Sequence, residues 1–157
     1  MKISAQEEYG LRCLLQLAHL EDGEALTLPQ LAEREGISTA NAGKLMWTLN
    51  NAGFVRSSRG AKGGYSLSRP ATEILLSEVI KVLEKDAIDA HCESYSGLKD
   101  SCVHKGECGI KPVIVGLHEV VQRALSNVTL ASLVSRGDQS FPTLYRIGRT
   151  EELADVQ

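Results

Sequence analysis

Apolar residues recur at spacings of three and four over much of the chain, which is the period of an amphipathic helix. The first such stretch begins at Ser4, which has Glu7 three residues later in the pattern of a capping box, and it continues to Gly23. Thr27 begins the same capping pattern before residues 28–36, where a shorter helix is predicted to end at a glycine. The amino-terminal part of the chain is therefore expected to be helical.

A third helix is predicted directly after the second. Ser38 can cap its amino-terminus and Gly53 can end it, and its apolar side is made by Ala42, Leu45, Met46 and Leu49. Two short helices joined by a tight turn that contains glycine form a helix-turn-helix unit. The second helix of such a unit can lie in the major groove of DNA.

The polar side of the third helix carries residue types that reach base edges and phosphates. Its members share one stripe, and they are Asn41, Lys44, Thr48 and Asn51, with Thr39 at the amino-terminal end. A solvated helix face is the alternative interpretation of the same pattern. Trp47 flanks the stripe and fits either half-buried packing or a contact.

Two short segments with the pattern of strands follow this helix, at residues 54–58 and 65–68. The run R-G-A-K-G-G joins them, and its glycines permit turns with positive φ and close approach of the backbone to a ligand. A basic, glycine-rich hairpin directly after a helix-turn-helix unit is a wing. Its predicted DNA contacts are Arg59, Gly60 and Lys62, and Arg59 suits a narrow minor groove.

The second half of the chain predicts fewer elements. Ser77 is expected to cap a helix that ends near residue 85, and Pro112 to start the last long helix. That helix has an apolar seam of Ile114, Leu117, Val121, Leu125 and Val128, which either packs on its own domain or pairs with a second copy. Thr129 can cap one more short helix, and residues 136–157 have the composition of a flexible tail.

The charge is unevenly distributed. A net charge of -3 argues against a generally basic nucleic-acid binder. Residues 54–69, however, hold four basic side chains and no acidic one, which fits a local phosphate-contacting surface.

The sequence shows no signal peptide and no apolar run long enough to cross a membrane, so a cytoplasmic protein is expected. It also shows no catalytic motif, so the protein is not expected to be an enzyme.

Three of the four cysteines lie in one glycine-containing stretch, at Cys92, Cys102 and Cys108. Because disulfides are rare in the cytosol and thiolates bind soft metals, these residues favour a metal or redox site. Their spacing lacks the paired C-x-x-C of zinc ribbons, and zinc would need a fourth ligand such as His104. Cys13 lies within the first helix and is expected to be a small core residue.

The run A-G-F-V-R-S-S-R-G-A-K-G-G-Y-S-L-S-R, residues 52–69, resembles the wing signature of the IscR/NsrR-like winged-helix regulators. The early Y-G-L-R-C-L-L-Q-L-A, the L-A-E-R-E-G-I-S turn and the later N-V-T-L-A-S-L-V resemble the same family, so the similarity covers roughly residues 1–135. This resemblance implies a homodimer with a long dimerising helix. Many members of the family also carry an iron–sulfur cluster.

The resemblance implies that Cys92, Cys102 and Cys108 hold a 2Fe–2S or 4Fe–4S cluster. The chain departs from the family at two points, because nine residues rather than about five separate the first two cysteines, and Lys111 replaces a histidine ligand. Nitric-oxide-sensing members instead resemble this chain at Glu8, where a carboxylate from the partner subunit completes the cluster. Without the resemblance, Glu8 is interpreted as an exposed acidic residue in the first turn of a helix, where it is favourable to the helix dipole.

The expected fold class is mainly α. A winged helix-turn-helix domain is expected at residues 1–85, a cysteine-bearing cluster loop and a long dimerisation helix at 86–135, and a flexible tail at 136–157. The expected function is a homodimeric regulator of transcription that binds a palindromic site in double-stranded DNA. An iron–sulfur cluster that senses redox state, cluster status or nitric oxide would control this binding. The alternative is a winged-helix protein whose zinc or thiol–disulfide switch acts through protein contacts.

Overall fold

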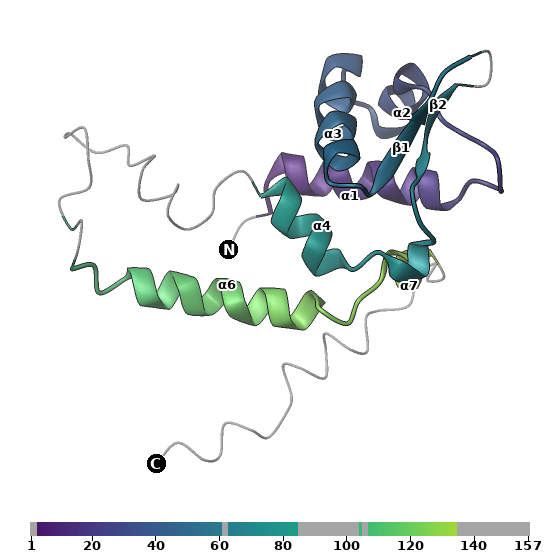
Figure 1. Cartoon of the computed structure of the whole chain (residues 1–157). Helices are drawn as coiled ribbons and strands as arrows, with labels where there is room; N and C mark the ends of the chain where they lie inside the picture. The colour runs from purple at the N-terminus through teal and green to yellow at the C-terminus, as the bar shows by residue number, and fades with distance from the viewer. Residues whose placement is uncertain (1–2, 61–62, 85–103, 105–106, 135–157) are drawn as a thin grey trace.

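A computed structural model describes residues 3–60, 63–84, 104 and 107–134 of the 157-residue chain. Its elements, in chain order, are α1 (Ala5–Ala18), α2 (Leu28–Glu35), α3 (Thr39–Asn51), β1 (Val55–Ser58), β2 (Gly64–Leu67), the 3-10 helix η1 (Ala71–Glu73), α4 (Leu76–Leu83), α6 (Lys111–Leu125) and α7 (Leu130–Val134) (Figure 1). The mainly helical fold with one small antiparallel sheet confirms the predicted fold class. Cys92, Cys102, Lys62 and the predicted tail lie outside the described residues.

The first three helices begin where their polar caps predict. The Ser4 hydroxyl accepts a hydrogen bond from the Glu7 backbone N–H, and the Glu7 carboxylate accepts one from the Ser4 N–H, which completes a capping box. Thr27 begins a second capping box at α2, and Ser38 caps α3. The first helix is shorter than expected, because α1 ends at Ala18 rather than near Gly23.

The predicted cap at Ser77 is wrong. Helix α4 begins at Leu76, with Leu75 rather than Ser77 at the cap position, and no side chain caps it. The Leu76 N–H instead donates to the carbonyl of Val128, and the Leu130 N–H donates to the carbonyl of Ile74. A backbone bridge to the segment before α7 therefore satisfies the groups that a local cap would otherwise bind.

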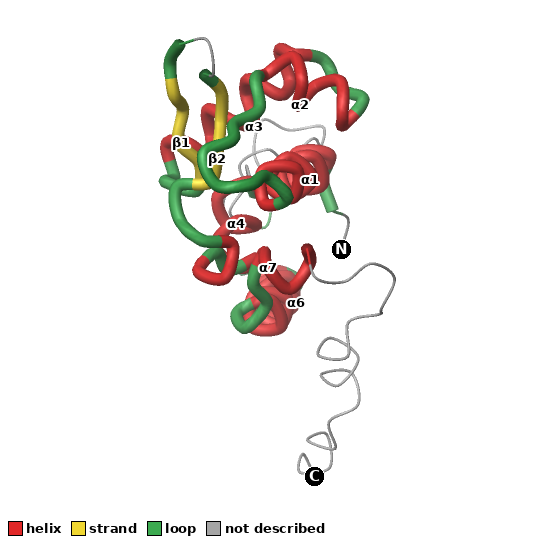
Figure 2. Tube along the Cα trace, turned by 90° about the vertical axis from the view of Figure 1, so that its right-hand side faces the viewer, coloured by secondary structure: helices red, strands yellow, loops and turns green. Residues whose placement is uncertain are grey.

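Helix α1 lies at the centre of the domain and contacts α2, α3, α4 and α7. Viewed end-on in Figure 2, it runs between the helix-turn-helix unit and the layer formed by α4 and α7. Its inner face carries Gly10, Cys13, Leu14 and Leu17, and the last three join one core with the inner residues of α3 and α4. The prediction that Cys13 is a core residue is confirmed, since its side chain is fully buried.

Helix α6 has two different apolar parts. Near its carboxyl end, Leu125 packs against the core and the following Val128 is buried in it. Nearer its start, Ile114 and Leu117 are exposed together with Ile110, Val113 and Val120. The predicted seam therefore divides between packing on its own domain and an open face.

Among the described residues, no helix is long and apolar enough to cross a membrane.

Candidate nucleic-acid interface

A tight turn sets α3 across α2. Gly36 ends α2 with a left-handed φ of 65°, a conformation that glycine adopts without strain, and Ser38 then starts α3. The buried residues of α3 are Ala42, Leu45, Met46 and Leu49, as predicted. The opposite side of α3 is left facing solvent.

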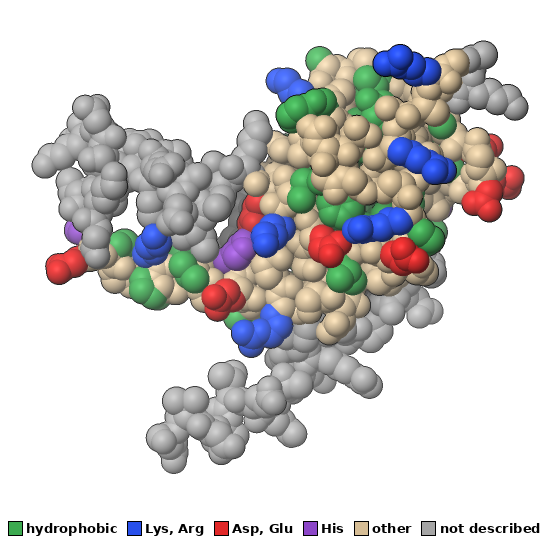
Figure 3. Space-filling model, viewed as in Figure 1, with side chains coloured by type: hydrophobic (Ala, Val, Ile, Leu, Met, Phe, Trp, Pro, Cys, Tyr) green, Lys and Arg blue, Asp and Glu red, His purple; other side chains and the backbone are tan. Residues whose placement is uncertain are grey.

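The predicted polar stripe lies on that open side. Thr39, Asn41 and Lys44 are exposed, whereas Thr48 is half-buried and its hydroxyl donates to the Lys44 carbonyl at 3.1 Å. Lys44 is the only charged residue of α3, which has no acidic side chain. In Figure 3 the end of the molecule around α3 and the hairpin shows lysine and arginine but no acidic side chains on the visible face. This surface is suited to a polyanion.

Trp47 lies on the same open side and is 67% exposed. The sequence left its place undecided, because an indole fits a core as readily as a surface. The structure excludes half-buried packing for this residue. Trp47 thus joins the exposed stripe as a large apolar side chain.

The wing is formed by β1 and β2, which pair antiparallel from Val55↔Leu67 to Ser58↔Gly64. Arg59 is exposed directly after β1, and Gly60 has a left-handed φ of 112° that favours glycine. The predicted contact Lys62 falls in the undescribed tip of the hairpin. The structure therefore places Arg59 and Gly60 directly after β1, at the described end of the wing.

A second backbone pairing fixes the wing against the helix-turn-helix unit. Leu26, just before α2, exchanges two backbone hydrogen bonds with Tyr65 of β2, at 3.0 and 2.7 Å. A Cβ atom at Gly64 would lie 2.7 Å from the Leu26 backbone, so only glycine fits at this point. Wing and α2 are thus held as one unit.

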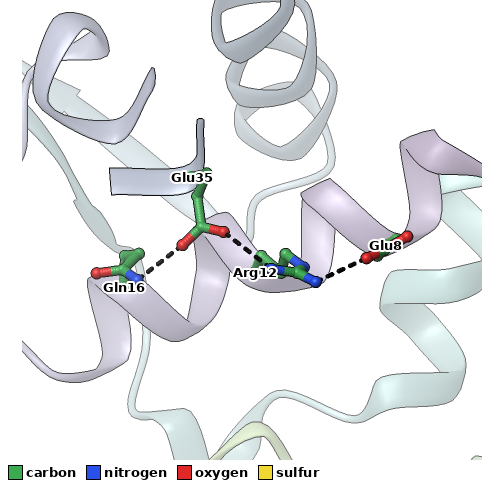
Figure 4. Close-up of polar contacts among 4 residues, drawn as sticks. All are labelled: Glu8, Arg12, Gln16 and Glu35. Carbon is green, nitrogen blue, oxygen red and sulfur yellow. Dashed lines mark hydrogen bonds and ion pairs between the residues drawn. The ribbon is translucent and has the colours of Figure 1, made fainter. Parts of the chain in front are cut away.

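A polar chain connects α1 with α2 (Figure 4). Arg12 binds Glu8 at 2.8 Å and lies 3.9 Å from Glu35, and Gln16 donates to Glu35 at 2.7 Å. The Glu35 side chain is only 5% exposed, whereas the Glu8 side chain is 49% exposed.

Desolvation by burial and, second, the charge of Glu35 raise the pKa of the Cys13 thiol to about 12. Cys13 therefore stays protonated and is a poor metal ligand.

Only one of the three predicted cysteine ligands is described. Cys108 is a free, half-buried cysteine just before α6, and its carbonyl accepts a hydrogen bond from the Lys111 N–H at 3.3 Å. His104, the alternative fourth ligand for zinc, is exposed. Within the described ranges, no three His, Cys, Asp or Glu side chains are grouped to hold a metal ion. The ligand set of Cys92, Cys102, Cys108 and Glu8 stays a prediction.

Known proteins resemble this chain over most of its length. Residues 3–136 match the sequence model of the Rrf2 family, described as an iron-dependent transcriptional regulator. The oxidized form of Staphylococcus aureus CymR is 32% identical with a TM-score of 0.65, and the match covers 88% of this chain and 100% of that one. CymR (YrzC), the global cysteine regulator of B. subtilis, is 30% identical with a TM-score of 0.64, covering 88% of this chain and 99% of that one.

A third similar structure is IscR of T. potens, which is 28% identical with a TM-score of 0.65. This match covers 92% of the present chain and 96% of the other. The family match, the winged helix-turn-helix fold and the exposed, acid-free face of α3 agree with one another. The chain belongs to the Rrf2 family of transcriptional regulators.

Proposed function

We propose that this chain is a homodimeric regulator that binds a palindromic promoter site through its winged helix-turn-helix domain. The open face of α3 is the observation that carries the proposal, because it combines hydrogen-bonding side chains and one cation with no acid. In this proposal Thr39, Asn41, Lys44 and Thr48 meet the major groove. Arg59, Gly60 and Lys62 of the wing meet the neighbouring backbone and minor groove.

The exposed apolar face of α6 supports a dimer. Large side chains such as Val113, Leu117 and Val120 are more than half exposed along one side of this helix. A contiguous apolar surface of this kind marks an interaction site. Pairing α6 with its copy about a two-fold axis would present two α3 helices to the two halves of a palindrome.

The residues that would hold an iron–sulfur cluster are Cys92, Cys102 and Cys108, with Glu8 of the partner subunit. Their chemistry fits the group, since three soft thiolates are joined by one harder and weaker carboxylate. Glu8 is half-exposed and its ion pair is with Arg12 on its own helix, so exchanging that partner would cost little. The cluster would supply a redox-sensitive and labile centre.

The test is to express the chain without oxygen and measure iron, acid-labile sulfide and the visible spectrum. We expect coloured protein that contains iron, and a colourless Cys102→Ala variant with altered affinity for its promoter site. A matched Cys13→Ala variant should keep the cluster, because Cys13 is buried in the core. Colourless, iron-free protein from anaerobic cells would contradict the cluster.

A thiol switch is a second candidate function. It is favoured by the 32% identity to a CymR crystallised in an oxidized form. In that case the chain would lack iron, and oxidation of Cys92, Cys102 or Cys108 would change its affinity for DNA. Counting free thiols before and after peroxide treatment, beside the iron analysis, distinguishes this function from the cluster.

A further inference from the structure

We infer that Trp47 reads the 5-methyl group of a thymine in the major groove, which makes it a specificity-determining residue of the interface. This inference rests on the proposed function, since it requires α3 to enter DNA. It goes further by assigning a base and an atom to one side chain. Trp47 is not among the polar residues that the sequence pattern selected.

The position of Trp47 on α3 supports this role. Residues three and four apart on a helix share a face, so Ala40, Lys44 and Trp47 lie together on the side opposite the buried Leu49. Lys44 is exposed and is already assigned to the DNA surface by its charge. Any groove edge that meets Lys44 also meets Trp47.

Trp47 has no structural use within the described part of the chain. It is 67% exposed, is absent from the hydrophobic core, and its indole N–H has no hydrogen-bond partner among the described residues. A large exposed apolar side chain on the face of a DNA-reading helix gains little from packing on its own domain. Its apolar surface is free to be buried against a ligand.

The surface beside Trp47 has room for a small apolar group. A hollow there is lined by Ala40, Gly43 and Lys44 of α3 and by Ala5 and Gln6 of α1. A Cβ built at Gly43 would lie 3.8 Å from Leu28 Cδ1, an ordinary van der Waals contact, so a methyl group fits over this glycine without a clash. Two small residues beside an indole form an apolar notch with a cation at its edge.

The chemistry of the major groove selects thymine for this notch. Each base pair presents its own pattern there, and only thymine adds a methyl group that apolar side chains contact. The hollow is lined by no acidic residue that would repel the phosphates. Burying one methyl group against Trp47 should tighten binding roughly fourfold.

The experiment selects binding sites for the full-length protein, prepared without oxygen, from a random duplex library. Each thymine of the selected site is then replaced singly by deoxyuridine, which pairs identically but lacks the methyl group. We expect one thymine per half-site at which wild-type protein loses about fourfold in affinity. Trp47→Ala should show no loss at that base, whereas Trp47→Phe should keep part of it. Circular dichroism checks that the surface variants remain folded.

The outcomes separate this inference from the function on which it rests. If wild-type protein selects no sequence, the proposed function fails and the inference fails with it. If it selects a site but no uracil substitution matters, the inference alone is overturned. It is also overturned if Trp47→Ala keeps the full uracil penalty, even with weaker overall binding, because Trp47 would then contact the backbone only.

Discussion

Gly10 of α1 lies directly against Leu83 of α4. A Cβ atom added at Gly10 would meet Leu83 Cδ1 at 2.5 Å and Cδ2 at 2.8 Å. The Leu83 side chain is fully buried, so it cannot turn out into solvent to avoid the added methyl group. The absence of a side chain at Gly10 is thus what lets α1 and α4 pack closely.

We expect Gly10→Ala to destabilise the fold by about 1–3 kcal/mol, because it overpacks this contact. Alanine alone would favour the helix by about 1 kcal/mol, so the sign of the change reports the clash. Urea unfolding of the two proteins measures the difference. Combining Gly10→Ala with Leu83→Val should cost less than the sum of the two single changes.

Gly43→Ala is the matched control for this prediction. It also lies inside a helix, but its added Cβ has only Leu28 Cδ1 within 4 Å, at 3.8 Å. We expect it to stabilise the protein by up to about 1 kcal/mol. A similar loss of stability for both variants would show that helix geometry, rather than the contact with Leu83, requires Gly10.

The buried Cys13 thiol should make stability fall in alkaline solution. Its pKa rises from 9.0 to about 12 in the folded chain, so the folded state keeps a proton that the unfolded state loses above pH 9. Stability from this group is therefore complete below pH 9 and declines as pH rises towards 12, by about 1.4 kcal/mol per pH unit. Unfolding of wild-type and Cys13→Ala protein at pH 8 and pH 10 measures this.

Other groups also titrate above pH 9, so only the difference between the two proteins is informative. The gap in unfolding free energy should narrow as pH rises, since the alanine variant has no thiol to ionise. Parallel pH dependences would contradict the effect of burial. In the native state Cys13 should also react with thiol reagents far more slowly than in urea.

The two carboxylates that flank Arg12 should differ in their value to stability. The Glu35 side chain is almost buried and accepts from the Gln16 NH2 group, so Glu35→Ala removes that acceptor and should cost about 1–3 kcal/mol. Glu8 makes an exposed pair with Arg12, so Glu8→Ala should cost less than about 1 kcal/mol. Chemical unfolding in low and high salt tests both. Equal costs would contradict the ranking by burial.

Local patterns allowed much of this fold to be predicted from the sequence. The caps at Ser4, Thr27 and Ser38 act within three residues, so the residues that make them are visible as short motifs. The prediction of a cap at Ser77 was wrong because the Leu76 N–H bonds to the carbonyl of Val128, more than fifty residues later. No short sequence motif encodes such a bridge. The exposure of Trp47 could not be predicted from the sequence either, since residue type alone does not say which side of a helix packs.

The wing should contribute to affinity mainly through charge. Arg59 is exposed directly after β1, so Arg59→Ala should weaken binding to the promoter site and lower the slope of log affinity against log salt by about 1. Lys81→Ala, which removes an exposed cation on α4, is the control and should leave the slope unchanged. Fluorescence anisotropy at several salt concentrations gives both slopes. An unchanged slope for Arg59→Ala would remove the wing from the interface.

The open face of α6 should decide the oligomeric state. Leu117 is 58% exposed in the middle of this face, between Val113 and Val120. A charge placed there would be desolvated in a two-fold interface and would oppose its own copy across the axis, so Leu117→Lys should shift the protein from dimer to monomer. Glu119→Lys also introduces a lysine, at an exposed position outside this apolar face, and should leave the dimer intact. Analytical ultracentrifugation at several protein concentrations measures the mass. If Leu117→Lys remains dimeric while Glu119→Lys dissociates, a different face of α6 forms the interface.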